Sequence, residues 1–249
     1  MNMIPKRLKK EPLIEVIWQV QFEPATGTPV GDLLPGILFA ALRNEHPNLQ
    51  SQRLPSADIP AQMAQIDPNL RHIAKYRMEE QNSPFMYQVG DRIITLNCRR
   101  PYEGWATFKK KILSLVGIIE NSCLVPAPLR HSLRYIDLLT LEPAPDLSSL
   151  QLSLKLGAFD IRARPLQTRV ELLDETCTHV VQVATPAQVG FPEGMKEGSI
   201  VDLETFSTEN PKGWNDITTQ IDHLHERSKA LFFENILTTQ AIEMLDPEY

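Results

Sequence analysis

The sequence contains few cysteines and few glycines, and this scarcity excludes several kinds of site. Three cysteines occur among 249 residues, at positions 98, 123 and 177. Their odd number and wide spacing match neither a disulfide framework nor a zinc ribbon. The 11 glycines do not cluster as a phosphate-binding loop requires, and the chain has no G-x-G-x-x-G, Walker, H-E-x-x-H or nucleophile-elbow motif. We therefore expect neither a cofactor nor a metal.

Long apolar runs and a basic charge balance are also missing. Polar residues from Glu15 to Glu23 interrupt the first hydrophobic segment, unlike a secretory signal, and no run reaches the length of a membrane span. The formal net charge is -6 and the isoelectric point is about 5.6. Basic residues are dense only at 6–10 and 109–111, without the aromatic pattern of a nucleic-acid surface. We expect a cytoplasmic protein that binds neither membranes nor nucleic acid.

What remains is an ordinary globular composition, with 42% hydrophobic and 22% charged residues. Apolar residues that alternate predict strands over 13–22, 71–81, 85–98, 131–141, 159–173, 178–185 and 199–207. Apolar stripes predict helices over 31–44, 104–121 and 214–234, and over 240–245 with Thr238 or Thr239 as its cap. We also expect Asp32 to cap the first helix and a short helix or helical turn over 146–156. A long loop with one short strand is expected over 47–68, and a loop over 186–198.

The order strand, helix, strands, helix restarts near residue 126. Three pairs of dipeptides recur in the same order: Glu23-Pro24 and Glu142-Pro143, Asp32-Leu33 and Asp146-Leu147, Gly104-Trp105 and Gly213-Trp214. Agreement between these landmarks and the order of elements indicates an internal duplication. The sequence predicts an α+β fold of two similar halves, 1–125 and 126–249, packed as one compact unit. Their antiparallel sheets are expected to surround a pseudo-twofold axis, with a ligand groove between the halves.

Charged residues inside apolar strands are the strongest candidates for a functional site. They are Glu15, Arg134, Asp137 and Asp202. Burial of a lone charge is costly, so such residues face water or find partners. One hypothesis is an ion pair between Glu15 and Arg134 that fixes strand register. The other is a polar site in the groove, to which His225 contributes.

Two further clusters have weaker support. Asp222, His225 and Glu226 share one helix face, which is compatible with a partial metal site or with a solvated helix edge. Cys177 and His179 share a strand face, but side chains two residues apart are separated by about 7 Å. This spacing favours a structural thiol over a nucleophile.

The segment Pro186–Gly198 is rich in glycine and proline and carries Phe191 and Met195. Loops of this composition often present contact residues. We therefore expect a mobile binding loop here, with an ordinary hairpin connection as the alternative.

Several motifs also carry a family resemblance. They are Pro12-Leu13-Ile14-Glu15, then Tyr102-Glu103-Gly104-Trp105 with Phe108, then Leu133-Arg134-Tyr135-Ile136-Asp137, and finally Leu224-His225, Phe232 and Leu237-Thr238. In this ordered set the chain resembles a sporadically distributed family of uncharacterised bacterial proteins of about 250 residues. The resemblance implies no defined chemistry. The patchy occurrence of that family implies mobile operons, such as defence or toxin–antitoxin loci.

These observations favour a non-enzymatic binding or regulatory protein that recognises a protein partner or a small ligand. A homodimer is left open. The alternative is a hydrolase-type enzyme with a polar site between the halves. Convergence of Glu15, Arg134, Asp202 and His225 in one open pocket would favour the enzyme. Separation of these residues, or their closure into ion pairs, would favour the interaction protein.

Overall fold

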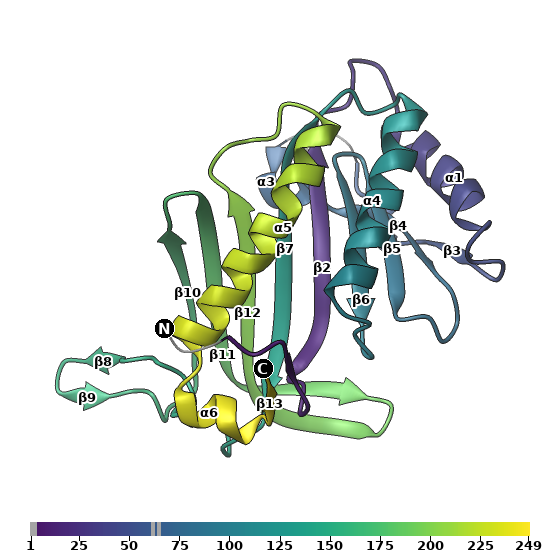
Figure 1. Ribbon diagram of the computed structural model, residues 1–249. Helices are drawn as coiled ribbons and strands as arrows, with labels where there is room; N and C mark the ends of the chain where they lie inside the picture. Colours follow the sequence, from purple (N-terminus) through teal and green to yellow (C-terminus); the bar gives the residue numbers. More distant parts are fainter. Residues whose placement is uncertain (1–3, 61–62, 64–65) are drawn as a thin grey trace. The chain divides into compact units, whose positions relative to one another are not determined.

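The computed structural model describes residues 4–60, 63 and 66–249, and it has an α+β fold with a large antiparallel sheet (Figure 1). The strands are β1 (Arg7–Leu8), β2 (Leu13–Phe22), β3 (Gln50–Arg53), β4 (Ala74–Glu79), β5 (Phe85–Gly90), β6 (Ile93–Arg99), β7 (Pro128–Leu139), β8 (Lys155–Leu156), β9 (Phe159–Asp160), β10 (Leu166–Leu173), β11 (Cys177–Phe191), β12 (Gly194–Ser207) and β13 (Pro247–Glu248). The helices are α1 (Val30–Leu42), η1 (Pro55–Asp58), α3 (Pro68–Arg71), α4 (Trp105–Ser122), α5 (Trp214–Leu231), the π-helical turn η2 (Phe232–Ile236) and α6 (Thr239–Met244). None of the helices in these described residues is both long enough and apolar enough to cross a membrane.

The chain forms two compact units that are interleaved along the sequence. Unit 1 contains Met1–Glu15, Arg134–Thr208 and His223–Tyr249, and unit 2 contains Val16–Leu133 and Glu209–Asp222. Strands β2 and β7 are neighbours in the main sheet, and each contributes residues to both units. The predicted division into two similar sequential halves, 1–125 and 126–249, would reflect a duplication of the chain, and it stays a prediction.

The sheet of unit 1 has the strand order β10-β11-β12-β7-β2. Alternate residues of its strands, including Val181, Val183, Val201 and Leu203, form a core with η2, the following Leu237, and α6. Figure 1 shows that α5 crosses the same strands. Because side chains alternate along a strand, the residues between these core positions point to the opposite face. Unit 1 thus has one face covered by helices and a more open face, where Arg134 is partly exposed while Val180 and Leu138 are buried.

Two segments of unit 1 differ from the sequence-based expectation. Of the short helix or helical turn predicted over 146–156, the structure has only turns, one of them closed by a hydrogen bond from the Leu150 N–H to the Leu147 carbonyl. Leu147 and Leu150 fill the core from a chain of turns, and the Asp146 carboxylate accepts a hydrogen bond from the Ser148 N–H, which favours a turn over a helix.

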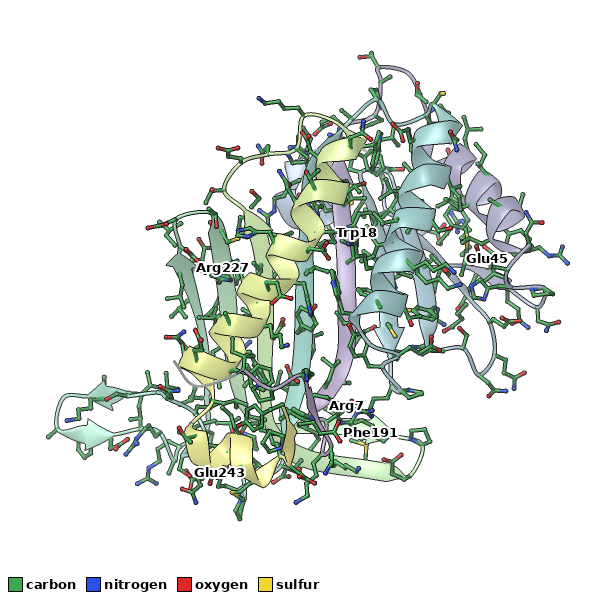
Figure 2. All side chains as sticks on the ribbon, viewed as in Figure 1. Arg7, Trp18, Glu45, Phe191, Arg227 and Glu243 are labelled. Atoms are coloured by element: carbon green, nitrogen blue, oxygen red, sulfur yellow. The ribbon has the colours of Figure 1, made fainter. Side chains whose placement is uncertain are left out.

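The predicted loop over 186–198 is also wrong, because β11 and β12 continue through it as a hairpin. Their pairing extends to Phe191 opposite Gly194, with a register shift between Ala184 and Ala187. Phe191 lies near the hairpin tip (Figure 2), and the Lys196 ammonium is 5.1 Å from the centre of its ring. Met195 remains exposed.

Unit 2 is built on the antiparallel strands β6-β5-β4-β3 together with β2, α1 and α4. Helix α4 begins at Trp105, one residue after the predicted start. Its buried residues form the apolar stripe expected from the sequence: Phe108, Ile112, Leu115, Val116 and Ile119. The cap expected for α1 is wrong, because Pro29 precedes this helix and Asp32 lies inside its first turn. Thr238 does cap α6 in unit 1, where its side chain accepts a hydrogen bond from the Ala241 N–H.

A buried histidine links three elements of unit 2. Trp18 of β2, labelled in Figure 2, is fully buried, and its indole N–H points at His131 Nδ1 at 3.4 Å. His131 Nε2 lies 2.9 Å from Gln220 Oε1 on α5. Because an indole can only donate, the imidazole accepts at Nδ1 and donates from Nε2. Burial lowers the pKa of His131 to about 4, so the ring is neutral at pH 7.

Candidate functional site

The main polar feature of unit 1 is a bidentate ion pair across β7 and β12. Arg134 donates from Nε to Asp202 Oδ1 at 2.7 Å and from Nη2 to Asp202 Oδ2 at 2.5 Å. Gln182 of β11 also donates to Asp202 Oδ2, at 3.3 Å. The hydrogen bonds to Asp202 raise the pKa of Arg134, and the charges of Glu204 and Glu15 act in the same direction. The guanidinium and the carboxylate neutralise one another.

This ion pair lies on the open face of the sheet. Gln182 and Asp202 are paired residues, and they alternate with the core residues Val181, Val183, Val201 and Leu203. The Arg134 side chain is 36% exposed and that of Asp202 is 11% exposed. Asp202 is therefore largely enclosed by its donors, whereas Arg134 retains contact with solvent.

The five candidate polar residues do not share one face. Glu15, Arg134 and Asp202 belong to the open face. Tyr135, the neighbour of Arg134, points the other way, and its hydroxyl lies 2.8 Å from His225 Nδ1 on α5. Asp137 is two residues beyond Tyr135 on β7, so it shares the helix-covered face, where it is 4% exposed. The structure thus separates His225 and Asp137 from the Arg134 cluster.

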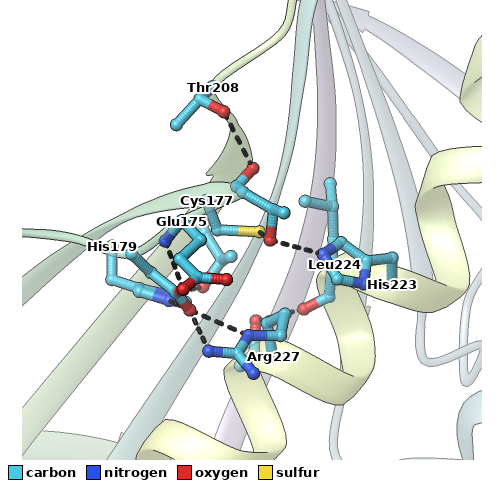
Figure 3. A network of polar contacts seen from close by, with 11 residues as sticks. Glu175, Cys177, His179, Thr208, His223, Leu224 and Arg227 are labelled. Carbon is cyan, nitrogen blue, oxygen red and sulfur yellow. Dashed lines mark hydrogen bonds and ion pairs between the residues drawn. The ribbon is translucent and has the colours of Figure 1, made fainter.

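A second polar network lies on the helix-covered face of unit 1 (Figure 3). Arg227 reaches from α5 to Asp174, in the turn that follows β10, and hydrogen-bonds its Oδ2. His179 Nε2 is 3.6 Å from the same carboxylate, and His179 Nδ1 is 2.8 Å from Thr205 Oγ1. The hydrogen bonds from Arg227 lower the pKa of Asp174, and burial lowers the pKa of His179. The network joins the β10–β11 turn, β11, β12 and α5.

Cys177 lies beside this network but is not poised as a nucleophile. Burial raises the pKa of its thiol, which disfavours the reactive thiolate. Both ring nitrogens of His179 face other groups, so His179 is not directed at Cys177 Sγ as a base. The nearest hydroxyl, that of Thr176, also contacts His223 Nε2 at 2.7 Å. This geometry agrees with a structural thiol.

The hypothetical metal ligands on α5 take other partners. Asp222 accepts hydrogen bonds from the Trp105 indole and the Lys109 ammonium within unit 2. His225 is held by Tyr135, and its distance to Glu226 is 4.0 Å. Across the described ranges, no three His, Cys, Asp or Glu side chains are grouped so that they could hold an ion.

Sequence reasoning missed a different surface, the outer edge of β10. This strand ends the sheet, and its eight residues pair only with β11 on their inner side within the described part of the chain. Val170 and Leu172 are 45% and 42% exposed, and Leu173 is 83% exposed. The alternating pattern of 166–173 was a visible signal for a strand, but its place at the end of the sheet depends on topology.

The unpaired backbone groups of β10 can be assigned to residues. The Asp174 N–H bonds to the Cys177 carbonyl at 2.9 Å, which continues the β10–β11 ladder by one pair. In an antiparallel ladder the N–H and C=O of one residue point the same way, and successive residues alternate. Leu172, Val170 and Thr168 therefore face β11. Gln167, Arg169, Glu171 and Leu173 present their N–H and C=O groups outward.

The edge of unit 2 differs in length and chemistry. Strand β3 has the sequence Gln50-Ser51-Gln52-Arg53, which is short and wholly polar. Natural sheets protect their edges from unwanted pairing with such strands. The β10 edge is longer and more apolar, and its charged residues are limited to Arg169 and Glu171.

Comparison with known proteins assigns no family to the chain. Neither the protein-family models nor the curated proteins include a match to this sequence.

Proposed function

We propose that this chain is a non-enzymatic binding protein that recognises another polypeptide by strand addition to β10. The observation that carries the proposal is an eight-residue edge strand with outward backbone groups at Gln167, Arg169, Glu171 and Leu173. In strand addition, the backbone hydrogen bonds supply affinity and alternate side chains supply specificity. The exposed Val170 and Leu172 on one face and Leu173 on the other would supply the apolar contacts.

The polar residues favour binding over hydrolysis. Arg134 and Asp202 neutralise each other, and His225 and Asp137 lie on the other face of the sheet. Hydrolysis by these groups would require a nucleophile and its base in one site. A small-ligand site has weaker support than a peptide edge, because the most enclosed carboxylate, Asp202, already has its donors.

We further infer that the chain arose by duplication, and this inference supports the open edge. From the central strands outward, the order β2-β6-β5-β4 in the first half matches β7-β12-β11-β10 in the second. Helices α4 and α5 both have 18 residues, and both begin at a tryptophan after a glycine. In this correspondence β10 matches β4, whose outer side is covered by β3. The second half has no counterpart of β3, so the equivalent position beside β10 is available to another strand.

A regulatory role in a defence or toxin–antitoxin operon would suit such a protein. A partner that must adopt an extended conformation to bind can be held and released without chemistry. The duplication itself is tested by an experimental structure of the chain. Trp105 and Trp214 should coincide when the strands β2 and β4–β6 are superposed on β7 and β10–β12, and unrelated positions would contradict it.

Site-specific photocrosslinking tests strand addition. Leu173→p-benzoylphenylalanine places the probe on the β10 edge, and Ser51→p-benzoylphenylalanine places it on the β3 edge as the matched control. Irradiation of cells that contain each variant should yield a protein adduct from position 173 and none from position 51. Glu171→Pro removes one outward N–H without loss of a β11 hydrogen bond, so it should abolish the adduct. Absence of an adduct at position 173, or an adduct that persists with Glu171→Pro, would contradict the proposal.

A further inference from the structure

We propose that the polypeptide bound at β10 is β10 of a second copy of this chain. The two strands pair antiparallel about a twofold axis at Val170, so a homodimer extends the sheet across the axis. This inference rests on the proposed function, because it names the partner of the same edge. It follows from the order of charges and apolar residues along the strand.

The charges of β10 are self-complementary about Val170. With Val170 opposite the partner's Val170, Arg169 lies opposite the partner's Glu171, and Glu171 lies opposite the partner's Arg169. Within one chain these two side chains already form an exposed ion pair at 2.7 Å. Directly opposite residues on neighbouring strands approach to about 4.5–5.5 Å between their Cβ atoms, and opposite charges there stabilise pairing. In the dimer, the internal ion pair between Arg169 and Glu171 of each chain is thus replaced by ion pairs between these residues across the axis.

The backbone pattern agrees with the same axis. Arg169 and Glu171 present outward N–H and C=O groups, so each forms a hydrogen-bonded pair with its opposite residue. Gln167 and Leu173 do the same at the ends of the overlap. Four such pairs give roughly eight backbone hydrogen bonds. Val170 faces β11, so it meets the partner's Val170 as a non-hydrogen-bonded pair, the type in which side chains come closest.

The apolar residues find suitable neighbours in this register. The exposed Val170 side chains meet on the axis, and Leu172 lies opposite the partner's Thr168, whose methyl group it can contact. All of these residues belong to the helix-covered face of their sheet. Pairing therefore removes apolar surface from water on the side where α5 leaves the edge strand uncovered.

Neighbouring registers are unfavourable because they bring like charges together. Residues whose backbone groups point outward must pair with each other. The nearest alternative registers therefore place the axis one residue away, at Arg169 or at Glu171. An axis at Arg169 would place two arginines opposite each other, and an axis at Glu171 would place two glutamates opposite each other. Like charges directly opposite destabilise a sheet. Of these three arrangements, the axis at Val170 alone gives opposite charges at both positions.

Charge reversal tests this register in solution. Sedimentation velocity over a concentration series should show that the full chain dimerises. Glu171→Arg and Arg169→Glu should each weaken self-association by roughly tenfold or more, since each places like charges across the axis twice. A mixture of these two variants should form the heterodimer, and the double variant R169E/E171R should dimerise like the original chain. An unchanged circular dichroism spectrum in each variant shows that the fold of the monomer is intact, whereas the melting temperature is expected to fall with the loss of self-association. Single reversals without effect, or failure of both the mixture and the double variant to recover, would overturn the proposal.

A disulfide trap tests the axis independently of charge. A non-hydrogen-bonded antiparallel pair has its Cα atoms about 4.5 Å apart, which is within disulfide range. In a Cys123→Ser background, which removes the exposed native thiol, Val170→Cys should therefore form a covalent dimer under mild oxidation. Thr168→Cys is the matched control, because it lies opposite the partner's Leu172 and far from its own copy. Equal crosslinking of both variants, or none from Val170→Cys, would contradict an axis at Val170.

The two proposals fail in different ways. If the position-173 photoadduct contains a different protein and the chain sediments as a monomer, strand addition stands and self-pairing is wrong. If no adduct forms and the chain is monomeric, both are wrong.

Discussion

Removal of the Arg134 side chain should destabilise the protein by an intermediate amount. Loss of one member of a fully buried ion pair costs about 3–5 kcal/mol, whereas an exposed pair contributes about 0–1 kcal/mol. Arg134 is 36% exposed while Asp202 is 11% exposed. After Arg134→Ala, Asp202 keeps the hydrogen bond from Gln182 but loses both guanidinium donors. We expect a loss of about 2 kcal/mol, between the buried and exposed limits.

Thermal and urea unfolding measure this loss. For a chain of this size, about 2 kcal/mol corresponds to a fall in melting temperature of about 4–8 °C. Arg134→Lys keeps the charge but not the bidentate geometry, so its melting temperature should lie between those of the unchanged protein and Arg134→Ala. Arg7→Ala is the matched control in unit 1, because Arg7 forms an exposed pair with Glu11 and should change stability by less than about 1 kcal/mol.

A double-mutant cycle isolates the interaction itself. Arg134→Ala and Asp202→Ala should show a coupling free energy of about 1–2 kcal/mol, since the two side chains contact each other directly. A coupling below about 0.5 kcal/mol would refute the view that this pair joins β7 to β12, even if each single variant were destabilised.

Two further predictions concern unit 2 and the packing of glycines. The pKa of His131 is lowered from about 6.5 when unfolded to about 4 when folded, so the unfolded chain binds more protons between these values. The contribution of neutral His131 to the free energy of unfolding should be complete above about pH 6.5 and should decline by about 3 kcal/mol as the pH falls toward about 4. His131→Asn should reduce this dependence of stability on pH, measured by urea titrations at several pH values. Gly198→Ala should destabilise the protein by roughly 1–3 kcal/mol, because its Cβ would lie 2.3 Å from the Leu139 carbonyl oxygen. Gly117→Ala on α4 should stabilise it by about 0.5–1 kcal/mol, because nothing lies within 4 Å of the new methyl group. Equal melting temperatures for the two glycine variants would contradict this contrast.

The sequence predicted elements whose signals are local and failed where tertiary context decides. The α4 stripe is local, since Phe108, Ile112 and Leu115 recur at helical spacing and are buried. The hairpin over 186–198 was mistaken for a loop because proline normally breaks a strand. Pro186 lies at the register shift between β11 and β12, where its missing N–H removes no ladder bond.

The candidate site shows the same limit. The sequence indicated that Arg134 needed a partner, but it could not identify Asp202 as the bidentate acceptor. That choice depends on the register of β7 against β12, which join residues 68 positions apart. The exposure of β10 was equally inaccessible, because an alternating strand looks the same at the edge of a sheet and inside it. Only the strand order shows which one lacks a neighbour.

The pairing of β1 with β13 constrains the order in which the chain can fold during synthesis. Residues 7 and 8 leave the ribosome early, yet their hydrogen-bonding partners are residues 247 and 248. Unit 2 has its full set of residues once position 222 has been made, whereas unit 1 must wait for its C-terminal segment. Contacts between residues so distant in sequence form slowly because a large loop must close first. The β10 edge is therefore synthesised well before the C-terminal segment that completes the core of its own unit.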